Sequence, residues 1–322
     1  METLSVVVPA TDAPATLPRC LRAIAVAAAS PDPVVVVADP PHLSAAGARN
    51  AGAADAVGDV IVFVDADVEV DPGAFTRIRE RLVARPELAA VYGSYDDTPG
   101  AHDTVSVFRN LLHHHVHHEG AGPSDTFWTG LGAVRRSWFE AVDGFDEDRY
   151  PHPSVEDIDF GRRLRAAGGR IELDPTIQGK HLKAWTFRSM VWTDFARRGI
   201  PWVELEWRGR RLSSALNLGW RHRLSALACV LGVICALVGR WAPAAISLVV
   251  LLLLNRAFYG LLLRRLGPVR AAVGVGLHAV HHLVAAAALL AGVAALVFAG
   301  GSGGRARRRL NADVIDDASA LE

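Results

Sequence analysis

The stretch DVIVFVDADVEV, Asp59–Val70, places an unbroken apolar run directly before two acidic residues, Asp65 and Asp67. A short continuous run rich in β-branched residues is typical of a strand that is covered on both faces of a parallel sheet. A carboxylate at the end of such a strand is costly to bury unless a cation, a basic side chain or water meets it. The stretch therefore predicts a buried strand that ends at a polar site.

Two similar apolar runs, Leu4–Val8 and Val34–Ala38, precede this strand, and segments of helical character separate the three runs. This β-α-β-α-β order predicts an α/β fold with parallel strands and right-handed crossovers. In such sheets, ligands bind at the carboxyl ends of the strands. Those ends carry Pro9, Asp39 and the two aspartates of the opening stretch, so we expect all of them at one edge of one crevice.

The composition narrows the class of protein. The chain has 322 residues, with 34 basic and 34 acidic side chains and a formal net charge of zero, which does not favour nucleic acid as the main partner. The three cysteines, Cys20, Cys229 and Cys235, have no metal-ligand spacing, and we interpret Cys20 as a core residue. The absence of a disulfide framework favours a reducing cytoplasm for the N-terminal part. Met1 leads directly into a strand without a basic segment, so no signal peptide is expected.

The composition changes near Arg223. Beyond it, apolar residues dominate the runs Leu224–Gly239, Ala242–Leu263 and Ala271–Ala299. A bilayer crossing needs about 20 apolar residues, which the second and third runs reach and the first does not. A buried helical core is the alternative, but these runs have almost no polar face. The expected domains are an α/β domain at 1–222, a helical membrane region at 223–300 and a flexible basic and acidic tail at 301–322.

The basic residues leave the number of crossings open. Arg264, Arg265 and Arg270 separate the second and third apolar runs, and the cluster Arg305–Arg309 follows the third. Basic loops favour the cytoplasmic side of a membrane, so a single crossing between the two clusters would violate that rule. Either the third run is a hairpin or re-entrant segment, or one cluster breaks the rule.

Asp65 and Asp67 are two residues apart, so in a strand their side chains point to the same side. Two carboxylates placed in this way form a hard oxygen site that suits a divalent cation, Mg²⁺ or Mn²⁺, which bridges to substrate phosphates. The alternative is a polar strand end that caps a turn.

A dinucleotide fingerprint is excluded because Gly47 and Gly52 have the wrong spacing and place in the chain, and there is no P-loop.

Several segments occur in a recognisable order: VVVPA, VVVVAD, ARNAG, GDVIVFVDAD, GLGAVRRSWFEAVDGFDE and EDIDFGRRLRAAG. This series resembles family 2 glycosyltransferases. The likeness extends from Leu4 to Trp202. It implies a GT-A fold, which is a Rossmann-like nucleotide-diphospho-sugar transferase domain, followed here by C-terminal transmembrane helices. It also implies transfer of a sugar from a nucleotide donor with inversion.

The resemblance assigns roles to individual residues. On the donor side it implies Pro9, Asp39, Arg49 and Asp65, with Asp39 at the nucleotide base and Arg49 against the phosphates or ribose. The segment ADPP departs from the family's usual pattern after Asp39, so both UDP- and GDP-type donors remain open. The implied metal ligands are Asp67 and His181.

On the acceptor side the resemblance implies Trp128, Thr129, Gly130 and Glu156, with Asp157 as the general base. Such a base takes the acceptor's hydroxyl proton and typically contributes 10²–10⁴-fold. The turn DGFDE is implied to lie beneath the acceptor pocket.

The residues around Asp157 predict a helix. Ser154 is the expected N-cap, and Glu156 and Asp157 then fall in the first turn, about 100° apart around the axis, so they serve different tasks. The alternative is that both only complement the helix dipole. Asp159 and Arg163 have the spacing of an exposed ion pair.

Histidines occur in two clusters. In HHHVHH, His113–His118, the favoured interpretation is an amphipathic helix with Leu111, Leu112 and Val116 inward, and a metal site is the alternative. The second group lies in the third apolar run, where the alternatives are a place facing protein or a cavity and contact with a lipid phosphate. It consists of His278, His281 and His282.

Taken together, the residues and the resemblance predict a metal-dependent inverting glycosyltransferase of the cell inner membrane. The protein is expected to be multi-pass with a cytoplasmic catalytic domain. The expected partners are a nucleotide-sugar donor, a lipid-linked or envelope glycan acceptor and the membrane, with no nucleic acid. The alternatives are a polyprenyl-phosphate glycosyltransferase and a non-catalytic nucleotide-binding scaffold subunit.

Overall fold

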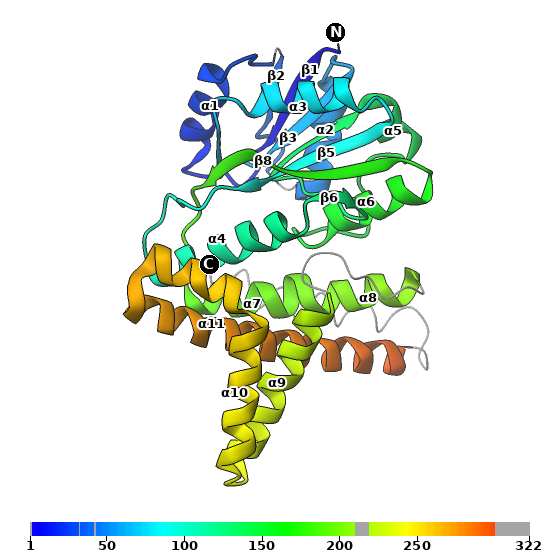
Figure 1. Cartoon of the computed structure of the whole chain (residues 1–322). Helices are drawn as coiled ribbons and strands as arrows, with labels where there is room; N and C mark the ends of the chain where they lie inside the picture. The colour runs from blue at the N-terminus through cyan, green and yellow to red at the C-terminus, as the bar shows by residue number, and fades with distance from the viewer. Residues whose placement is uncertain (1, 32, 42, 210–218, 300–322) are drawn as a thin grey trace. The chain divides into compact units, whose positions relative to one another are not determined.

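The chain forms two compact units in a computed structural model, Met1–Trp185 and Thr186–Glu322 (Figure 1). The structure describes residues 2–31, 33–41, 43–209 and 219–299. The expected tail at 301–322, with its basic cluster, lies outside these residues. The units divide at 185/186, whereas the composition changes near Arg223, because the polar helices after Trp185 group with the apolar ones. The domain boundary at 222/223 stays a prediction.

The first unit is built on one mixed sheet with the strand order β2-β1-β3-β7-β5-β8-β4, and β6 pairs with β8. The strands are β1 (Leu4–Pro9), β2 (Val34–Val37), β3 (Val60–Val64), β4 (Val68–Val70), β5 (Leu88–Tyr95), β6 (Gly122–Ser124), β7 (Leu131–Arg135) and β8 (Arg170–His181). Its helices are α1 (Leu17–Val26), α2 (Ala45–Asp55), α3 (Ala74–Ala84), α4 (Thr104–Glu119), α5 (Arg136–Ala141) and α6 (Glu156–Ala166).

The parallel β-α-β-α-β start is confirmed. β1 pairs in parallel with both β2 and β3. Pro9 lies opposite Val37, and Val7 lies opposite Phe63, so the carboxyl ends of the three strands are level. β2 is an edge strand with alternate residues exposed, so the expectation of cover on both faces holds only for β1 and β3.

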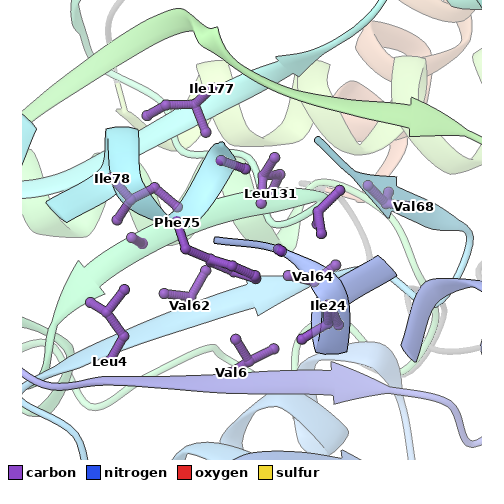
Figure 2. Close-up of a cluster of buried hydrophobic side chains, with 14 of the residues drawn as sticks. Leu4, Val6, Ile24, Val62, Val64, Val68, Phe75, Ile78, Leu131 and Ile177 are labelled. Carbon is purple, nitrogen blue, oxygen red and sulfur yellow. The ribbon is translucent and has the colours of Figure 1, made fainter. Parts of the chain in front are cut away.

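The core explains why β3 reads as continuously apolar. All five residues of β3 are fully buried. On one face, Val62 and Val64 pack against Phe75 and Ile78 of α3 in a cluster that Figure 2 shows in close-up. Burial of each such side chain contributes roughly 1.5–3 kcal/mol. The strand is therefore a rigid support for the acidic residues that follow it.

Two antiparallel pairings complete the sheet around β3. β7 lies antiparallel beside it, with Leu131 opposite Val64. The short strand β4 pairs antiparallel with the end of β8, so that Val68 lies opposite His181. These pairings bring segments far apart in the sequence to the carboxyl end of β3.

The second unit is helical. It contains α7 (Phe187–Trp192), the π-helix η1 (Thr193–Gly199), α8 (Ile200–Gly209), α9 (Trp220–Leu237), α10 (Trp241–Leu254) and α11 (Arg256–Ala299). Among the described residues, Trp220–Leu237 and Arg256–Phe298 are long and apolar enough to cross a membrane, which is a weak indication by itself.

The expected run Ala242–Leu263 is not one helix, because α10 ends at Leu254 and Asn255 has non-helical backbone angles. The next helix, α11, is itself interrupted at Gly267, which has a φ of 71° and precedes Pro268. The second apolar run therefore does not form a continuous span.

Candidate active site

The two aspartates lie where the sequence predicts, directly after β3 at the carboxyl edge of the sheet. The antiparallel partner β7 begins at Leu131, so the segment that precedes it lies beside the acids. The backbone N–H of Asp65 donates to the carbonyl oxygen of Gly130 at 3.2 Å. The predicted acceptor-side segment Trp128–Gly130 is thus brought next to the acidic pair.

Gly130 is required by a close approach within this segment. A Cβ at this position would lie 2.1 Å from a ring carbon of Trp128, whose indole covers the glycine backbone. Thr129 is buried and Trp128 is partly buried. The indole is therefore held against the strand end that carries Asp65.

Arg49 is the basic side chain that meets Asp65. Ser44 caps α2 by accepting a hydrogen bond from the backbone of Gly47, which fixes the first turn of the helix that carries Arg49. The Arg49 guanidinium donates to Asp65 Oδ1 at 2.8 Å and to Glu156 Oε1 at 2.9 Å. Its side chain is 6% exposed. One cation therefore bridges two carboxylates from different parts of the chain.

Glu156, which the resemblance places on the acceptor side, is buried. Its Oε1 accepts from Arg49, and its Oε2 accepts from the backbone N–H of Ser154 at 2.7 Å. Both carboxylate oxygens therefore have protein donors. The expected N-cap is also corrected, because Val155 occupies that position and no side chain caps α6. The Glu156 carboxylate instead holds the turn before the helix.

Asp67 is paired with His181 through the β4–β8 ladder. The His181 Nε2 atom lies 3.5 Å from Asp67 Oδ2, and the backbone N–H of Leu182 donates to the Asp67 carbonyl oxygen at 2.8 Å. The Asp67 side chain remains 26% exposed, whereas that of His181 is 6% exposed. Asp67 is thus the more accessible member of the pair.

The two aspartates have opposite pKa shifts. Burial raises the pKa of Asp65, and the neighbouring Asp67 adds to this effect, against the lowering influence of Arg49. Burial also acts to raise the pKa of Asp67, but interaction with His181 and the charge of Lys183 keep that pKa below its ordinary value. Asp67 is therefore held as an anion, as a metal-binding carboxylate must be.

Tyr95 is a part of the site that the sequence motifs do not indicate. Its ring stacks on His181 with centroids 4.2 Å apart and an interplanar angle of 20°. It also meets the edge of Trp128 at 4.8 Å. The link arises because β5, which ends at Tyr95, runs beside β8. Only the sheet order could have revealed this contact.

Asp157 lies in the first turn of α6, as expected, and is partly exposed. Its Oδ1 accepts from the backbone N–H of Ile158 at 2.8 Å. The expected pair of Asp159 with Arg163 is confirmed at 3.1 Å, but Asp159 is buried rather than exposed. Asp157 is therefore the accessible acid of this turn.

The turn DGFDE is clamped from two sides. Asn50 donates to the Phe145 carbonyl and accepts from the Phe145 backbone N–H, both at 2.9 Å. Arg163 donates to the carbonyl oxygen of Gly144 at 2.7 Å, and Gly144 adopts a φ of 58°. Residues from α2 and α6 thus hold the turn.

The structure gives fewer contacts for Pro9 and Asp39, the other two residues predicted on the donor side. Pro9 ends β1 level with the start of the acidic pair. Asp39 lies two residues beyond β2 and is exposed. Both occur at the carboxyl edge of the sheet, as expected, but the described contacts assign no further role to them.

The histidine cluster on α4 follows the favoured interpretation, because Leu111, Leu112 and Val116 are buried. The sequence did not indicate that His117 is buried as well, with its Nδ1 3.0 Å from the Gly93 carbonyl oxygen. Burial lowers the pKa of His117 to about 4. The cluster is therefore part of the packing of α4 on the sheet, in which His117 stays neutral at ordinary pH.

The described residues contain no group of three or more His, Cys, Asp or Glu side chains arranged to hold a metal ion. The donor chemistry at Asp67 and His181 nevertheless fits a divalent cation that takes its remaining ligands from substrate phosphates and water. Carboxylate oxygen is the preferred ligand for Mg²⁺ and Mn²⁺, which often bind through one or two protein groups.

Comparisons with known proteins agree with this arrangement. Residues 23–143 match the model of glycosyl transferase family 2, and residues 110–183 match the model described as the N-terminal domain of galactosyltransferase. The comparison with curated proteins gave no match.

Among solved structures, a mannosyltransferase from Pyrobaculum calidifontis in complex with GDP-Man and Mn²⁺ is similar. Its TM-score is 0.53 at 18% identity, over 90% of this chain and 87% of that one. GalNAc-T7 with UDP, GalNAc and Mn²⁺ has a TM-score of 0.42 at 15% identity, over 57% of this chain and 44% of that one. Residues 23–143 therefore match a family 2 glycosyltransferase domain, and the N-terminal unit that contains them has the GT-A fold.

Proposed function

We propose that this glycosyltransferase transfers a sugar with inversion from a nucleoside-diphosphate donor to an acceptor held at a membrane. The observation that supports this most directly is the acidic pair after β3. Asp65 is neutralised by Arg49, while Asp67 stays ionised and partly exposed beside His181. An accessible anion at the carboxyl edge of the sheet is suited to receive a cation and the diphosphate that the cation accompanies.

Asp67 and His181 would hold the divalent cation, which supplies positive charge to the departing diphosphate. Arg49 takes a different role from the expected direct contact with the donor. Because it is buried between Asp65 and Glu156, it positions Asp65 at the donor site and joins α2 to the start of α6. Pro9 and Asp39 lie at the same edge and are proposed to contact the nucleoside.

Asp157 is proposed as the general base. It is the accessible carboxylate in the first turn of α6, whereas its neighbours Glu156 and Asp159 are buried in ion pairs. A carboxylate in this position can accept the proton of an acceptor hydroxyl as the oxygen attacks the anomeric carbon. The indole of Trp128 and the neighbouring Thr129 are proposed to line the acceptor side.

The apolar helices of the second unit support attachment to the membrane. We propose that the catalytic unit works at the cytoplasmic face of the cell membrane and that the acceptor is lipid-linked or part of an envelope glycan. The similar mannosyltransferase is described with GDP-Man and Mn²⁺, which makes a GDP-sugar the first donor to test, followed by UDP-sugars.

Turnover of a panel of GDP- and UDP-sugars, with and without Mn²⁺, tests the donor and metal requirements. We expect hydrolysis or transfer with one class of donor only, and loss of activity with a chelator. Calorimetric titration of each nucleotide sugar gives donor binding independently of turnover. If no donor binds and none turns over, the proposed function is wrong and a scaffold role is favoured.

Asp157→Asn tests the base. We expect donor affinity to stay unchanged and turnover to fall by about 10²–10⁴-fold, because only proton removal is lost. Asp148→Asn is a matched control, since it makes the same change at an exposed acid nearby. Full activity in Asp157→Asn would remove this residue from the role, and weaker donor binding would point to a different one.

A further inference from the structure

The segment η1–α8 carries too many charged side chains to cross a bilayer. Its ionisable residues are Asp194, Arg197, Arg198, Glu204, Glu206 and Arg208. Each acidic or basic side chain at a bilayer centre costs about 2.5–3.5 kcal/mol on insertion scales. Six of them within two successive helices exclude a transmembrane position.

The second half of α11 runs alongside this charged segment. His281 Nδ1 lies 2.7 Å from Asp194 Oδ2. Further along, a Cβ on Gly199 would lie 2.5 Å from the Ala288 side chain. At the far end, a Cβ on Gly292 would lie 2.8 Å from Val203. From one contact to the next, the residue numbers increase in both segments, so the two segments run parallel. At a rise of 1.5 Å per residue, the contacts cover about 16 Å of α11.

The first half of α11 folds back on the second. The interruption at Gly267 and Pro268 turns the chain. The Tyr259 hydroxyl lies 3.0 Å from His278 Nδ1, and a Cβ on Gly274 would lie 2.9 Å from Leu262. Between these two pairs, the residue number increases in the first half of α11 and decreases in the second half. This is the pattern of an antiparallel helical hairpin. The first half, Arg256–Leu266, is about 16 Å long and too short for a hydrocarbon core of about 30 Å.

The middle of α11 lies at the base of a separate hairpin formed by α9 and α10, which pack side by side (Figure 1). Asn255, directly after α10, donates to Ser225 Oγ in the second turn of α9 at 2.8 Å. His222, in the first turn of α9, and His282 of α11 have ring centroids 6.1 Å apart. Both ends of the α9–α10 hairpin therefore meet α11 at one level.

We propose that α11 lies in the plane of the membrane, with η1–α8 on its aqueous side and lipid acyl chains against its exposed apolar side. Among the described helices, only α9 and α10 then enter the bilayer, as one hairpin whose two ends are on the same side. This inference rests on the membrane attachment in the proposed function. The large apolar residues that α11 offers to lipid beyond His282 are Leu289, Leu290, Val293, Val297 and Phe298, each more than 40% exposed.

The proposal resolves the conflict between the basic clusters. Because the hairpin returns to its starting side and α11 does not cross, Arg264, Arg265 and Arg270 are on the same side as the sequence Arg305–Arg309. Both clusters then obey the preference of basic residues for the cytoplasmic side. A crossing by α11 would place the last cluster on the opposite side.

Reporter fusions after residue 322 of the full chain test the side of the C-terminus. We expect a C-terminal green fluorescent protein to fluoresce in cells and a C-terminal alkaline phosphatase to be inactive, because the C-terminus stays cytoplasmic. Active phosphatase together with a dark fluorescent fusion would mean an odd number of crossings, which overturns the proposal.

Spin-label depth measurements test the position of α11 directly. In a Cys235→Ser background, labels at Val273, Leu290 and Val297 are compared by oxygen and nickel-complex accessibility in phospholipid vesicles. We expect similar depths at all three positions, although they span about 36 Å of helix. Depths that pass through the bilayer centre and emerge would show a crossing helix.

Labels at Leu224, Leu231 and Leu237 of α9 are the matched control, and their depths should change along the helix. A wild-type protein that leaves the membrane in alkaline carbonate would instead defeat membrane attachment itself. That result is distinct from a protein that stays in the membrane with α11 across the bilayer.

Discussion

Arg49 shows how one residue can organise a catalytic edge. Its guanidinium bridges Asp65 after β3 and Glu156 at the start of α6, and its side chain is 6% exposed. Removing one partner of a buried ion pair leaves uncompensated charge in a medium of low polarity, which is far more costly than loss of an exposed pair. The stability of the first unit should therefore depend on this arginine.

We expect Arg49→Met to lower the free energy of unfolding by about 3 kcal/mol, because Glu156 would remain buried without its cation. Urea unfolding of the detergent-solubilised full chain, followed by fluorescence, measures the change. Arg77→Met is the control, since Arg77 pairs with Asp71 at 2.6 Å while both side chains are about 40% exposed. That control should lose less than about 1 kcal/mol. Equal losses in both variants would contradict the role given to Arg49.

The buried side chain of His117 makes the free energy of unfolding depend on pH. Its pKa is lowered to about 4 by burial, whereas an unfolded histidine has a pKa of about 6.5. Between these two values the unfolded state binds more protons than the folded state, so stability falls as the pH is lowered through this window. At pH 7.5 the imidazole of His117 is neutral in both the folded and the unfolded state, so it no longer affects the pH dependence of stability.

We expect the wild-type protein to lose about 2 kcal/mol from this residue between pH 7.5 and pH 5. His117→Gln should remove that part of the pH dependence, whatever its effect at pH 7.5. His102→Gln, at an exposed position, should leave the dependence unchanged. Urea midpoints at the two pH values give the comparison, and an unaltered slope in His117→Gln would refute the assignment.

At the scale of elements, α2 depends on a close approach to the sheet. A Cβ on Gly52 would lie 2.3 Å from a methyl carbon of Val7 in β1 and 3.0 Å from one of Val37 in β2. In the same helix, a Cβ on Gly47 would lie 2.6 Å from a carboxylate oxygen of Glu147 and at ordinary contact distance, 3.5 Å, from Leu43 and Ser44. The long side chain can move away, whereas the strands cannot.

We therefore expect Gly52→Ala to destabilise the protein by about 1–3 kcal/mol through overpacking, although alanine favours helix by about 1 kcal/mol over glycine. Gly47→Ala should be neutral or slightly stabilising. Thermal unfolding of the two variants side by side measures this difference between two glycines of one helix. Similar behaviour of both would mean that α2 can shift on the sheet at little cost.

An element can be predicted from the sequence when the contacts that define it are local, and not when they join residues far apart in the chain. The strand β3 was predicted because its five residues are fully buried and β-branched or aromatic, which is a local signal. The proximity of Asp67 and His181 came only from the resemblance, because it depends on β4 pairing with β8 more than a hundred residues later. The contact of Tyr95 with His181 was not predicted, since no motif marks the end of β5.

The burial of Glu156 was missed for a related reason. Periodicity placed it correctly in the first turn of α6, but the partner that buries it, Arg49, comes from α2. A helix pattern gives the direction of a side chain relative to its own axis and carries no information about which distant element faces it. Residue roles at this edge of the sheet thus required the tertiary structure.

At the scale of the whole molecule, apolar composition alone suggested spans that the helices do not form. The run Ala242–Leu263 contains enough apolar residues to cross a bilayer, yet it is divided at Asn255 into helices that belong to different hairpins. Asn255 is almost fully buried and bonded to Ser225, so this break is a fixed feature of the helical unit. The hairpin of α9 and α10 is left as the element that enters the bilayer.

Charges placed on this hairpin should weaken membrane attachment. Leu231 and Leu248 lie near the middle of α9 and α10 and are 45% and 52% exposed, which is the exposure expected for lipid-facing residues. We expect the wild-type protein to stay in the membrane pellet after alkaline carbonate washing. The double variant Leu231→Lys and Leu248→Lys should move largely to the supernatant, because each lysine costs about 2.5–3.5 kcal/mol in the bilayer centre.

Val83→Lys, at a 65% exposed position of α3, controls for added charge and should remain in the pellet. A double variant that stays as firmly bound as the wild-type protein would mean that another surface provides the anchor.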